Sequence, residues 1–216
     1  MYCLETEILK PKSKKKPKNA IILCHGYAGK GKNIALLANF WRLHLNDTIF
    51  FCPNAPEKCN EDNLNYQWFS PSETNKHKLK ENVKKSEKKL NQFIDQILNE
   101  NSLTEKELVI GGFSQGCMLA LEAGLRRKKK IRAILGYSGK IVDTQNIINH
   151  INSKPDIYLF HGEKDEIVLP KYFFETEKFL KKNKFKVFTK LFKNCDHRIP
   201  AEAANLGLDF VKNAVL

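Results

Sequence analysis

The sequence lacks the features of several protein classes. Its six cysteines include no C-x-x-C pair and none has the spacing to histidine that zinc sites use. No apolar run approaches the roughly 20 residues that a helix needs to cross a bilayer. The first ten residues contain Glu5 and Glu7 and no unbroken apolar stretch, so they do not resemble a secretory signal. We therefore expect a cytoplasmic protein whose cysteines are reduced.

What the sequence has in excess is positive charge. The chain of 216 residues carries a formal net charge of +13, and its 14 Phe and 42% apolar residues exclude disorder as the main state. Six lysines lie in the run from Lys10 to Lys18 (KPKSKKKPK), and five more cations form the run RRKKK at residues 126–130. Outside these two runs the chain is close to neutral. The charge therefore belongs to two local clusters.

Short apolar runs that predict buried strands alternate with stretches of helical periodicity. Strands are predicted at residues 20–24, 48–52, 107–111, 131–137, 157–161 and 185–192, and helices at 33–45, 74–99, 115–127, 170–180 and 201–212. This alternation predicts a single α/β domain with a mainly parallel sheet and helices on both faces. Residues 1–18 are expected to form an N-terminal strand and a lysine-rich surface loop, and residues 19–216 the α/β domain itself.

The motif G-x-S-x-G occurs at residues 112–116 (GFSQG), directly after a predicted strand and directly before a predicted helix. A nucleophile at such a turn needs a strained backbone, and glycines at positions 112 and 116 remove the Cβ atoms that would clash there. The helix that begins at Gln115 points its positive end toward charge that develops beside Ser114. The motif therefore predicts Ser114 as a catalytic nucleophile.

A catalytic serine needs a base and an acid that orients the base, and the α/β-hydrolase fold arranges them along the chain as Ser, acid, His. His197 follows the strand predicted at 185–192, where the base belongs. His150 is interpreted as a surface residue, and His161 as a packing residue at a strand end. Asp165, on the loop after residue 161, is the expected acid, with Asp143 as the runner-up.

The segment HGYAG at residues 25–29 follows the first buried strand, where this fold supplies a backbone donor to the oxyanion hole. The backbone N–H groups of Tyr27 and Gln115 are therefore predicted to bind the tetrahedral oxyanion. His25 is expected to be structural, because it precedes the nucleophile. Apolar side chains near the motifs make Trp68, Phe69 and Ile167 candidates for the substrate pocket.

Six motifs occur in an order and spacing that resemble the phospholipase/carboxylesterase family of α/β-hydrolases, which includes acyl-protein thioesterases and bacterial carboxylesterases. The motifs are HGYAG, PNAP, QWF, GFSQG, HGEKDEIV and CDHRI. The resemblance implies a serine hydrolase of acyl esters or thioesters that uses no cofactor and no metal. It implies the triad Ser114, Asp165 and His197. The chain departs from the family pattern at Ser70, Cys117 and Ala203, of which the first adjoins the loop that would help line the acyl pocket.

Several alternatives stay open at this point. The enzyme could act as a lysophospholipase or an acyl-protein thioesterase at a membrane surface, with weak contact between Lys10–Lys18 and anionic lipid. A peptidase is a related reading, although no acidic cluster for binding an amine is present. The net charge also allows a non-catalytic nucleic-acid-binding protein, but no nucleic-acid motif accompanies the lysines. The oligomeric state cannot be read from the sequence.

Overall fold

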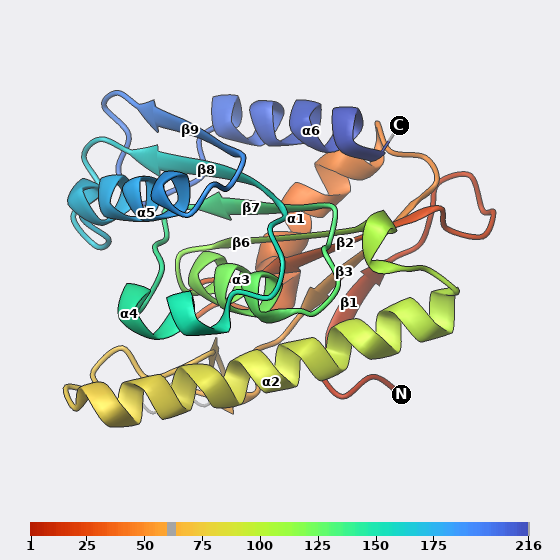
Figure 1. The fold of residues 1–216 in the computed structure, drawn as a ribbon. Coiled ribbons are helices and arrows are strands. Elements are labelled where there is room, and N and C mark those ends of the chain that lie inside the picture. The colour runs from red at the N-terminus through yellow and green to blue at the C-terminus, as the bar shows by residue number, and fades with distance from the viewer. Residues whose placement is uncertain (60–63, 216) are drawn as a thin grey trace.

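The computed structural model describes residues 1–59 and 64–215, which form an α/β domain around one large sheet (Figure 1). In the described residues this sheet has seven strands in the order β1-β3-β2-β6-β7-β8-β9. β1 is antiparallel to β3 and every other neighbouring pair is parallel. The strands are β1 (Thr6–Leu9), β2 (Asn19–Cys24), β3 (Thr48–Pro53), β6 (Leu108–Phe113), β7 (Ala133–Tyr137), β8 (Asp156–Gly162) and β9 (Val187–Phe192). The predicted mainly parallel sheet is confirmed.

Helices cover both faces of the sheet, as predicted. One face carries α1 (Gly31–Arg42) and α6 (Ala201–Val215), and the other carries α2 (Lys76–Asn101), α3 (Gln115–Arg126), α4 (Thr144–Ile147) and α5 (Pro170–Lys182). Figure 1 shows α6 on one side of the sheet and α2 and α3 on the other. Among the described residues no helix combines the length and the apolar character needed to cross a bilayer.

The alternation of side chains along β2 explains why its apolar run is continuous. All six residues of β2 are buried. Ile21 and Leu23 pack into the core beneath α1 and α6, whereas Ala20, Ile22 and Cys24 pack into the core on the opposite face. A strand with both faces covered needs apolar residues at every position. The same two-sided burial holds for β3.

The parallel strands give the sheet two distinct edges. The carboxyl ends of β2, β6, β7, β8 and β9 lie together at the carboxyl edge, to which the arrowheads of β7, β8 and β9 point in Figure 1. The loops that follow β2, β6, β8 and β9 therefore meet at this edge. The loops that precede the strands form the opposite amino edge. Ligand sites in open parallel sheets lie at the carboxyl edge.

Some elements differ from the sequence-based expectation. β9 begins at Val187 rather than at 185, and α2 runs from Lys76 to Asn101 instead of 74–99. The Asn75 side chain caps α2 by accepting hydrogen bonds from two backbone N–H groups, which sets the start of this helix. The helix α4, the 3-10 turns Glu105–Glu107 and Ile148–His150, and the hairpin of β4 (Glu57–Lys58) and β5 (Tyr66–Gln67) add to the predicted elements.

Candidate active site

Ser114 lies at the junction of β6 and α3, in a backbone conformation that few residues adopt. Its φ is 53° and its ψ is −117°, at the N-cap position of α3. The Ser114 N–H donates to the Tyr137 carbonyl at 2.8 Å, and its own carbonyl accepts from Met118 N–H at 3.1 Å. The neighbouring strand and the first turn of α3 thus hold a strained residue in place. Ser114 is 7% exposed.

Two glycines permit this tight turn. A Cβ on Gly112 would lie 2.3 Å from the Gly116 carbonyl carbon, and a Cβ on Gly116 would lie 2.1 Å from the Cys24 carbonyl oxygen. Both obstacles are backbone atoms, which cannot move aside as a side-chain end can. The close approach of α3 to β6 and β2 therefore requires glycine at both positions, as the sequence predicted for this motif.

His197 and Asp165 are brought together at the carboxyl edge from the loops after β9 and β8. His197 Nδ1 lies 2.7 Å from Asp165 Oδ2. A carboxylate oxygen accepts, so this contact places the proton of the neutral imidazole on Nδ1 and leaves the Nε2 lone pair available as a base. Asp165 is 1% exposed. Its other oxygen, Oδ1, accepts from the Ile167 and Val168 backbone N–H groups at 3.0 and 2.8 Å.

A second, fully buried histidine, which the sequence did not connect with the site, also lies close to Asp165. His161 Nε2 lies 2.7 Å from the Val168 carbonyl oxygen and 3.3 Å from Asp165 Oδ2. Because a carbonyl only accepts, Nε2 carries the proton and donates it to the Val168 carbonyl, with Asp165 Oδ2 close by. Burial lowers the pKa of His161, so the ring is neutral near pH 7. The spacing of four residues between His161 and Asp165 was the only signal in the sequence.

His197 adjoins the nucleophile through an aromatic contact. Its ring centroid lies 4.7 Å from that of Phe113, the residue before Ser114. A Cβ on Gly26 would lie 3.1 Å from the Phe113 ring and 3.3 Å from Ser114 Cβ, so these groups pack around one point. Within residues 1–59 and 64–215 no hydrogen bond joins His197 to Ser114 Oγ. Such bonds are often long in enzymes without substrate and tighten when substrate binds.

A cavity of about 360 Å³ opens beside these residues. Its walls include His25, Tyr27, Phe113, His197, Arg198 and Ile199. The predicted base and the Tyr27 loop therefore face the same space. The wall is mainly apolar, and the Arg198 guanidinium in it is paired with Asp196 at 2.8 Å. A substrate that entered this cavity would meet His197 directly.

The loop after β2 is shaped by His25. Its Nδ1 donates to the Gly26 carbonyl at 2.7 Å, and its Nε2 accepts from Ala55 N–H at 3.0 Å. Burial lowers the pKa of His25 to about 4, so this ring is neutral and fixed in one tautomer. The Gly29 N–H donates to the Gly26 carbonyl and closes a turn, in which Ala28 has a φ of 53°. His25 thus positions the segment that contains Tyr27.

The side chain of Gln115 has a role that the sequence did not reveal. Its Oε1 accepts from Trp68 N–H at 3.2 Å and its Nε2 donates to the Phe69 carbonyl at 2.8 Å. The same residue begins α3, where backbone N–H groups lack acceptors within the helix. Gln115 therefore joins the nucleophile turn to the segment at residues 68–69.

The three predicted pocket residues lie in different surroundings. Trp68 is fully buried and offers no surface to a substrate. Its indole N–H donates to the His25 carbonyl at 2.9 Å, so it helps to hold the loop after β2. Phe69 is 5% exposed and belongs to the same core. Ile167 is 73% exposed beside Asp165. None of the three lines the cavity beside His197.

The alternative acid and bases lie elsewhere. Asp143 caps α4 and pairs with Lys80 at 2.7 Å. The His150 ring is hydrogen-bonded to the Asn146 carbonyl on the exposed end of the same segment. Asp165 is thus the carboxylate that the structure places against His197. Among the described residues, no group of three or more His, Cys, Asp or Glu side chains is arranged to hold a metal ion.

Comparison with known proteins gives a consistent picture. The sequence model of the phospholipase/carboxylesterase family matches residues 5–214. Acyl-protein thioesterase 1 of Kluyveromyces lactis is 27% identical over 186 residues, which span 79% of this chain and 80% of that protein. The protein of the same name from Saccharomyces cerevisiae is 30% identical over 169 residues, spanning 70% and 72%. Esterase PE8 superposes with a TM-score of 0.93 at 27% identity, covering 98% of this chain and 99% of that one. The Bacillus cereus carboxylesterase, at 15% identity and a TM-score of 0.80, shares the fold.

Proposed function

The chain belongs to the phospholipase/carboxylesterase family of α/β-hydrolases, which act on carboxylic esters and thioesters, and we propose that Ser114, His197 and Asp165 form its catalytic triad. The observation that supports this most strongly is the 2.7 Å contact between Asp165 and His197, next to a serine held at a positive φ. This arrangement supplies a nucleophile, a base with a free Nε2 and a buried acid that fixes the base.

In the proposed first step, His197 Nε2 takes the proton of Ser114 Oγ while that oxygen attacks the acyl carbonyl carbon. The tetrahedral intermediate then collapses, and the bond from the acyl carbon to the alcohol oxygen or thiol sulfur breaks. The leaving group takes the proton from His197. The acyl group stays on Ser114 as an ester, and Asp165 stabilises the transient imidazolium without taking its proton.

The second step mirrors the first with water as the nucleophile. His197 Nε2 removes a proton from water, and the hydroxide oxygen attacks the acyl carbon. The bond to Ser114 Oγ breaks, and the serine oxygen recovers its proton from His197. The products are a free carboxylic acid and the original enzyme. Aside from substrate and water, no co-reactant is needed.

The oxyanion hole is assigned, as a proposal, to the backbone N–H groups of Tyr27 and Gln115. Two features support it. Gln115 occupies the first turn of α3, where the N–H groups and the helix dipole favour negative charge. Tyr27 lies in the turn that His25 and Gly29 stabilise, and it lines the cavity beside His197. Each donor in such a hole is worth about 10²–10³ in kcat.

Replacing Ser114 by Ala tests the nucleophile. The variant is expected to lose about 10⁴-fold or more in kcat on p-nitrophenyl butyrate, because no other group can form the acyl intermediate. Ser13 lies at the opposite edge of the sheet, so Ser13→Ala serves as the matched control and should keep full activity. An S114A enzyme with near wild-type turnover would contradict the proposal.

The substrate class is proposed from the relatives. The relatives from Kluyveromyces lactis and Saccharomyces cerevisiae carry the name acyl-protein thioesterase, and the solved structure with a TM-score of 0.93 is called an esterase. We propose that the enzyme accepts acyl thioesters as well as oxygen esters. Matched pairs of p-nitrophenyl esters and aryl thioesters across a series of acyl lengths test this. Thioester turnover that depends on Ser114 supports it, and turnover of oxygen esters alone refutes it.

A further inference from the structure

Five of the six loops that precede the parallel strands at the amino edge share one property. Every loop that precedes β2, β6, β7, β8 or β9 carries exposed lysine. The lysine loop (residues 10–18) connects β1 to β2 and is drawn in red at the right of Figure 1, opposite the arrowheads. Its backbone is attached to the loop before β3, since Ser13 N–H donates to the Asn46 carbonyl and Lys18 N–H to the Asp47 carbonyl. Segments far apart in sequence thus place lysine on one edge.

Most of these lysines have no acidic partner. In the described part of the chain, those with exposed side chains and no ion pair are Lys10, Lys12, Lys14, Lys15 and Lys16 before β2, Lys106 before β6, Lys128 and Lys129 before β7, Lys154 before β8 and Lys184 before β9. Of the carboxylates at this edge, Glu105 pairs with Arg127, and Glu107 accepts hydrogen bonds from Thr104. Asp47 pairs with Lys18, and Asp156 pairs with both Lys130 and Lys186. The edge therefore carries a large uncompensated positive charge.

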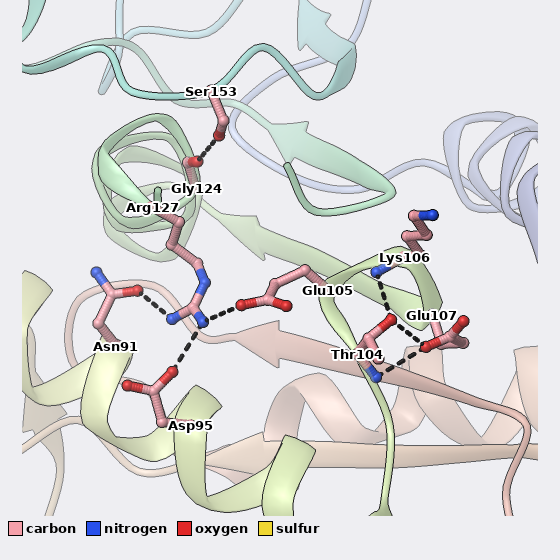
Figure 2. Close-up of polar contacts among 9 residues, drawn as sticks. All are labelled: Asn91, Asp95, Thr104, Glu105, Lys106, Glu107, Gly124, Arg127 and Ser153. Carbon is pink, nitrogen blue, oxygen red and sulfur yellow. Dashed lines mark hydrogen bonds and ion pairs between the residues drawn. The ribbon is translucent and has the colours of Figure 1, made fainter. Parts of the chain in front are cut away.

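Arg126 and Arg127, in contrast, form contacts inside the molecule, whereas Arg132 before β7 is exposed and donates to the Lys106 carbonyl. Figure 2 shows Arg127 reaching Asn91 and Asp95 on α2 and Glu105 on the 3-10 turn. Arg126 pairs with the buried Glu122 at 3.0 Å. The run at residues 126–130 is therefore not a uniform cationic cluster, because its two arginines hold helices together. Only its lysines are directed to solvent or to the surface pair with Asp156.

Two apolar side chains are exposed beside the lysine loop. α1 ends at this edge, and the Arg42 guanidinium in its last turn donates to the Lys10 carbonyl at 2.6 Å. Phe40, two residues before Arg42, and Leu43, directly after it, are 37% and 59% exposed. Exposed apolar groups next to lysine are the combination with which peripheral proteins bind a lipid surface, since the apolar groups enter the headgroup region while lysine attracts anionic lipid.

We propose that the amino edge is a docking surface for an anionic phospholipid bilayer, and that the carboxyl edge with the active site faces away from the lipid when the protein is docked. The charged groups are lysines, which act as point charges toward mobile headgroups. A nucleic acid would call for free arginine or stacking aromatic rings, and here Arg126 and Arg127 are engaged internally while Arg132 donates to the Lys106 carbonyl. The proposal does not depend on the assignment of the triad.

The orientation has a functional consequence. Because the cavity beside His197 opens at the carboxyl edge, docking through the amino edge leaves it accessible to water. Hydrolysis of a dissolved ester should proceed at the same rate with the enzyme free or bound to vesicles. The acyl groups of lipids in the same bilayer would be out of reach of Ser114.

Vesicle co-sedimentation tests the surface. The full-length protein is expected to bind vesicles of phosphatidylcholine mixed with phosphatidylglycerol at about 0.1 M salt, and to be released at about 1 M salt as the Debye length shrinks. Exchanging Lys14, Lys15 and Lys16 for Gln should weaken partitioning by about a hundred-fold, since each lysine near an anionic surface contributes on the order of a five-fold gain. Replacing Lys128 and Lys129 together by Gln should also weaken vesicle partitioning, by about twenty-five-fold.

The matched control has the same charge change at the carboxyl edge, where Lys32, Lys164 and Lys193 are exposed. Their triple Gln variant should bind vesicles as the wild type does. Equal loss of binding in the control and amino-edge variants would overturn the proposal. Wild-type protein that binds pure phosphatidylcholine vesicles as well as the anionic mixture would also overturn it. Tighter binding to a DNA duplex than to anionic vesicles at the same salt would replace the bilayer by a nucleic acid. All variants should hydrolyse p-nitrophenyl butyrate normally, which separates this outcome from a failure of the triad.

Discussion

At the scale of single residues, the carboxylate of Asp165 shows how the candidate site is held. Each of its oxygens has assigned donors. Oδ1 accepts from two backbone N–H groups in its own loop, and Oδ2 faces the rings of His197 and His161. A buried carboxylate needs this many donors to remain charged. His161 is therefore a positioning residue that acts through Asp165, since it is fully buried and cannot touch substrate.

His161→Phe should lower kcat by up to about ten-fold, because it removes an N–H group 3.3 Å from Asp165 Oδ2 and the hydrogen bond that holds the Val168 carbonyl. KM should change little, because the ring lies outside the cavity. His161→Gln keeps an N–H donor near the position of Nε2 and should restore kcat to within a few-fold of wild type. Steady-state kinetics on p-nitrophenyl butyrate decide this. Equal losses in the Phe and Gln variants would show that His161 only fills space.

Individual residues also show what the sequence could reveal. Ser114, Asp165 and His197 were named because a motif, its flanking elements and the chain order of the fold constrain them jointly. Trp68 was assigned to the pocket because it adjoins a motif, yet it is buried under the Tyr27 loop. Which way an aromatic side chain points depends on contacts such as that with the His25 carbonyl, and these are formed by residues distant in sequence.

At the scale of elements, the close approach of α3 to β2 and β6 positions the nucleophile turn. Gly116→Ala would place a Cβ 2.1 Å from the Cys24 carbonyl oxygen, which is backbone of a central strand. α3 would have to retreat, at a cost of about 1–3 kcal/mol in the free energy of unfolding. The Gln115 N–H would move with it, so activity should also fall.

Gly124→Ala, in the same helix, is the matched control for Gly116→Ala. Its Cβ would meet the terminal carbon of the Ile134 side chain at 2.6 Å, and such a group can rotate away. The gain in helix propensity partly offsets the crowding. Urea unfolding and ester hydrolysis of both variants test the contrast. If the two substitutions cost the same stability, the backbone contact at Gly116 does not limit the packing of α3.

Long elements were predictable, and short ones were not. The helix predicted at 74–99 showed an apolar stripe of helical period, and the structure moves each of its ends by only two residues, to Lys76 and Asn101. β4 and β5 have two residues each, so they contain no period, and their pairing depends on the folded chain around them. Asp143 was a candidate acid in the sequence, but its side chain caps the four-residue helix α4.

At the scale of the whole molecule, both cationic runs that contribute to the net charge of +13 lie at the same edge of the sheet. The sequence located two cationic runs but could not show that both lie at one edge, because this follows from the order and parallel direction of the strands. It also could not show that Arg126 and Arg127 are internal. The topology separates a cationic edge from an edge that carries the candidate active site.

The stability of the whole molecule should depend on pH through its buried histidines. As pH falls below 6.5 the unfolded chain gains a proton on His25, whereas the folded state, with a pKa of about 4, does not. The unfolded state binds more protons in this window, so the free energy of unfolding decreases as the pH decreases. For His25 the decrease is about 2 kcal/mol from pH 7.5 to pH 5. The lowered pKa of His161 acts in the same direction.

Urea unfolding across this pH range measures the effect. His25→Gln, which keeps an acceptor for Ala55 N–H, should show a flatter dependence than wild type. Burial raises the pKa values of Glu87 and Glu122. As pH rises, the loss of their protons lowers the free energy of unfolding, which partly offsets the gain from the histidines. An unchanged pH dependence in His25→Gln would contradict the assignment of a neutral, buried ring.

The central claim is that Ser114 is the nucleophile of an acyl hydrolase, and covalent labelling tests it most directly. A p-nitrophenyl alkylphosphonate reacts with an activated serine by transferring the phosphonyl group to Oγ and releasing p-nitrophenolate. The account predicts one label per chain, on the peptide that contains Ser114, with loss of activity in proportion to labelling and no label in Ser114→Ala or His197→Ala. A label on another residue, or full labelling of Ser114 with activity retained, would contradict it.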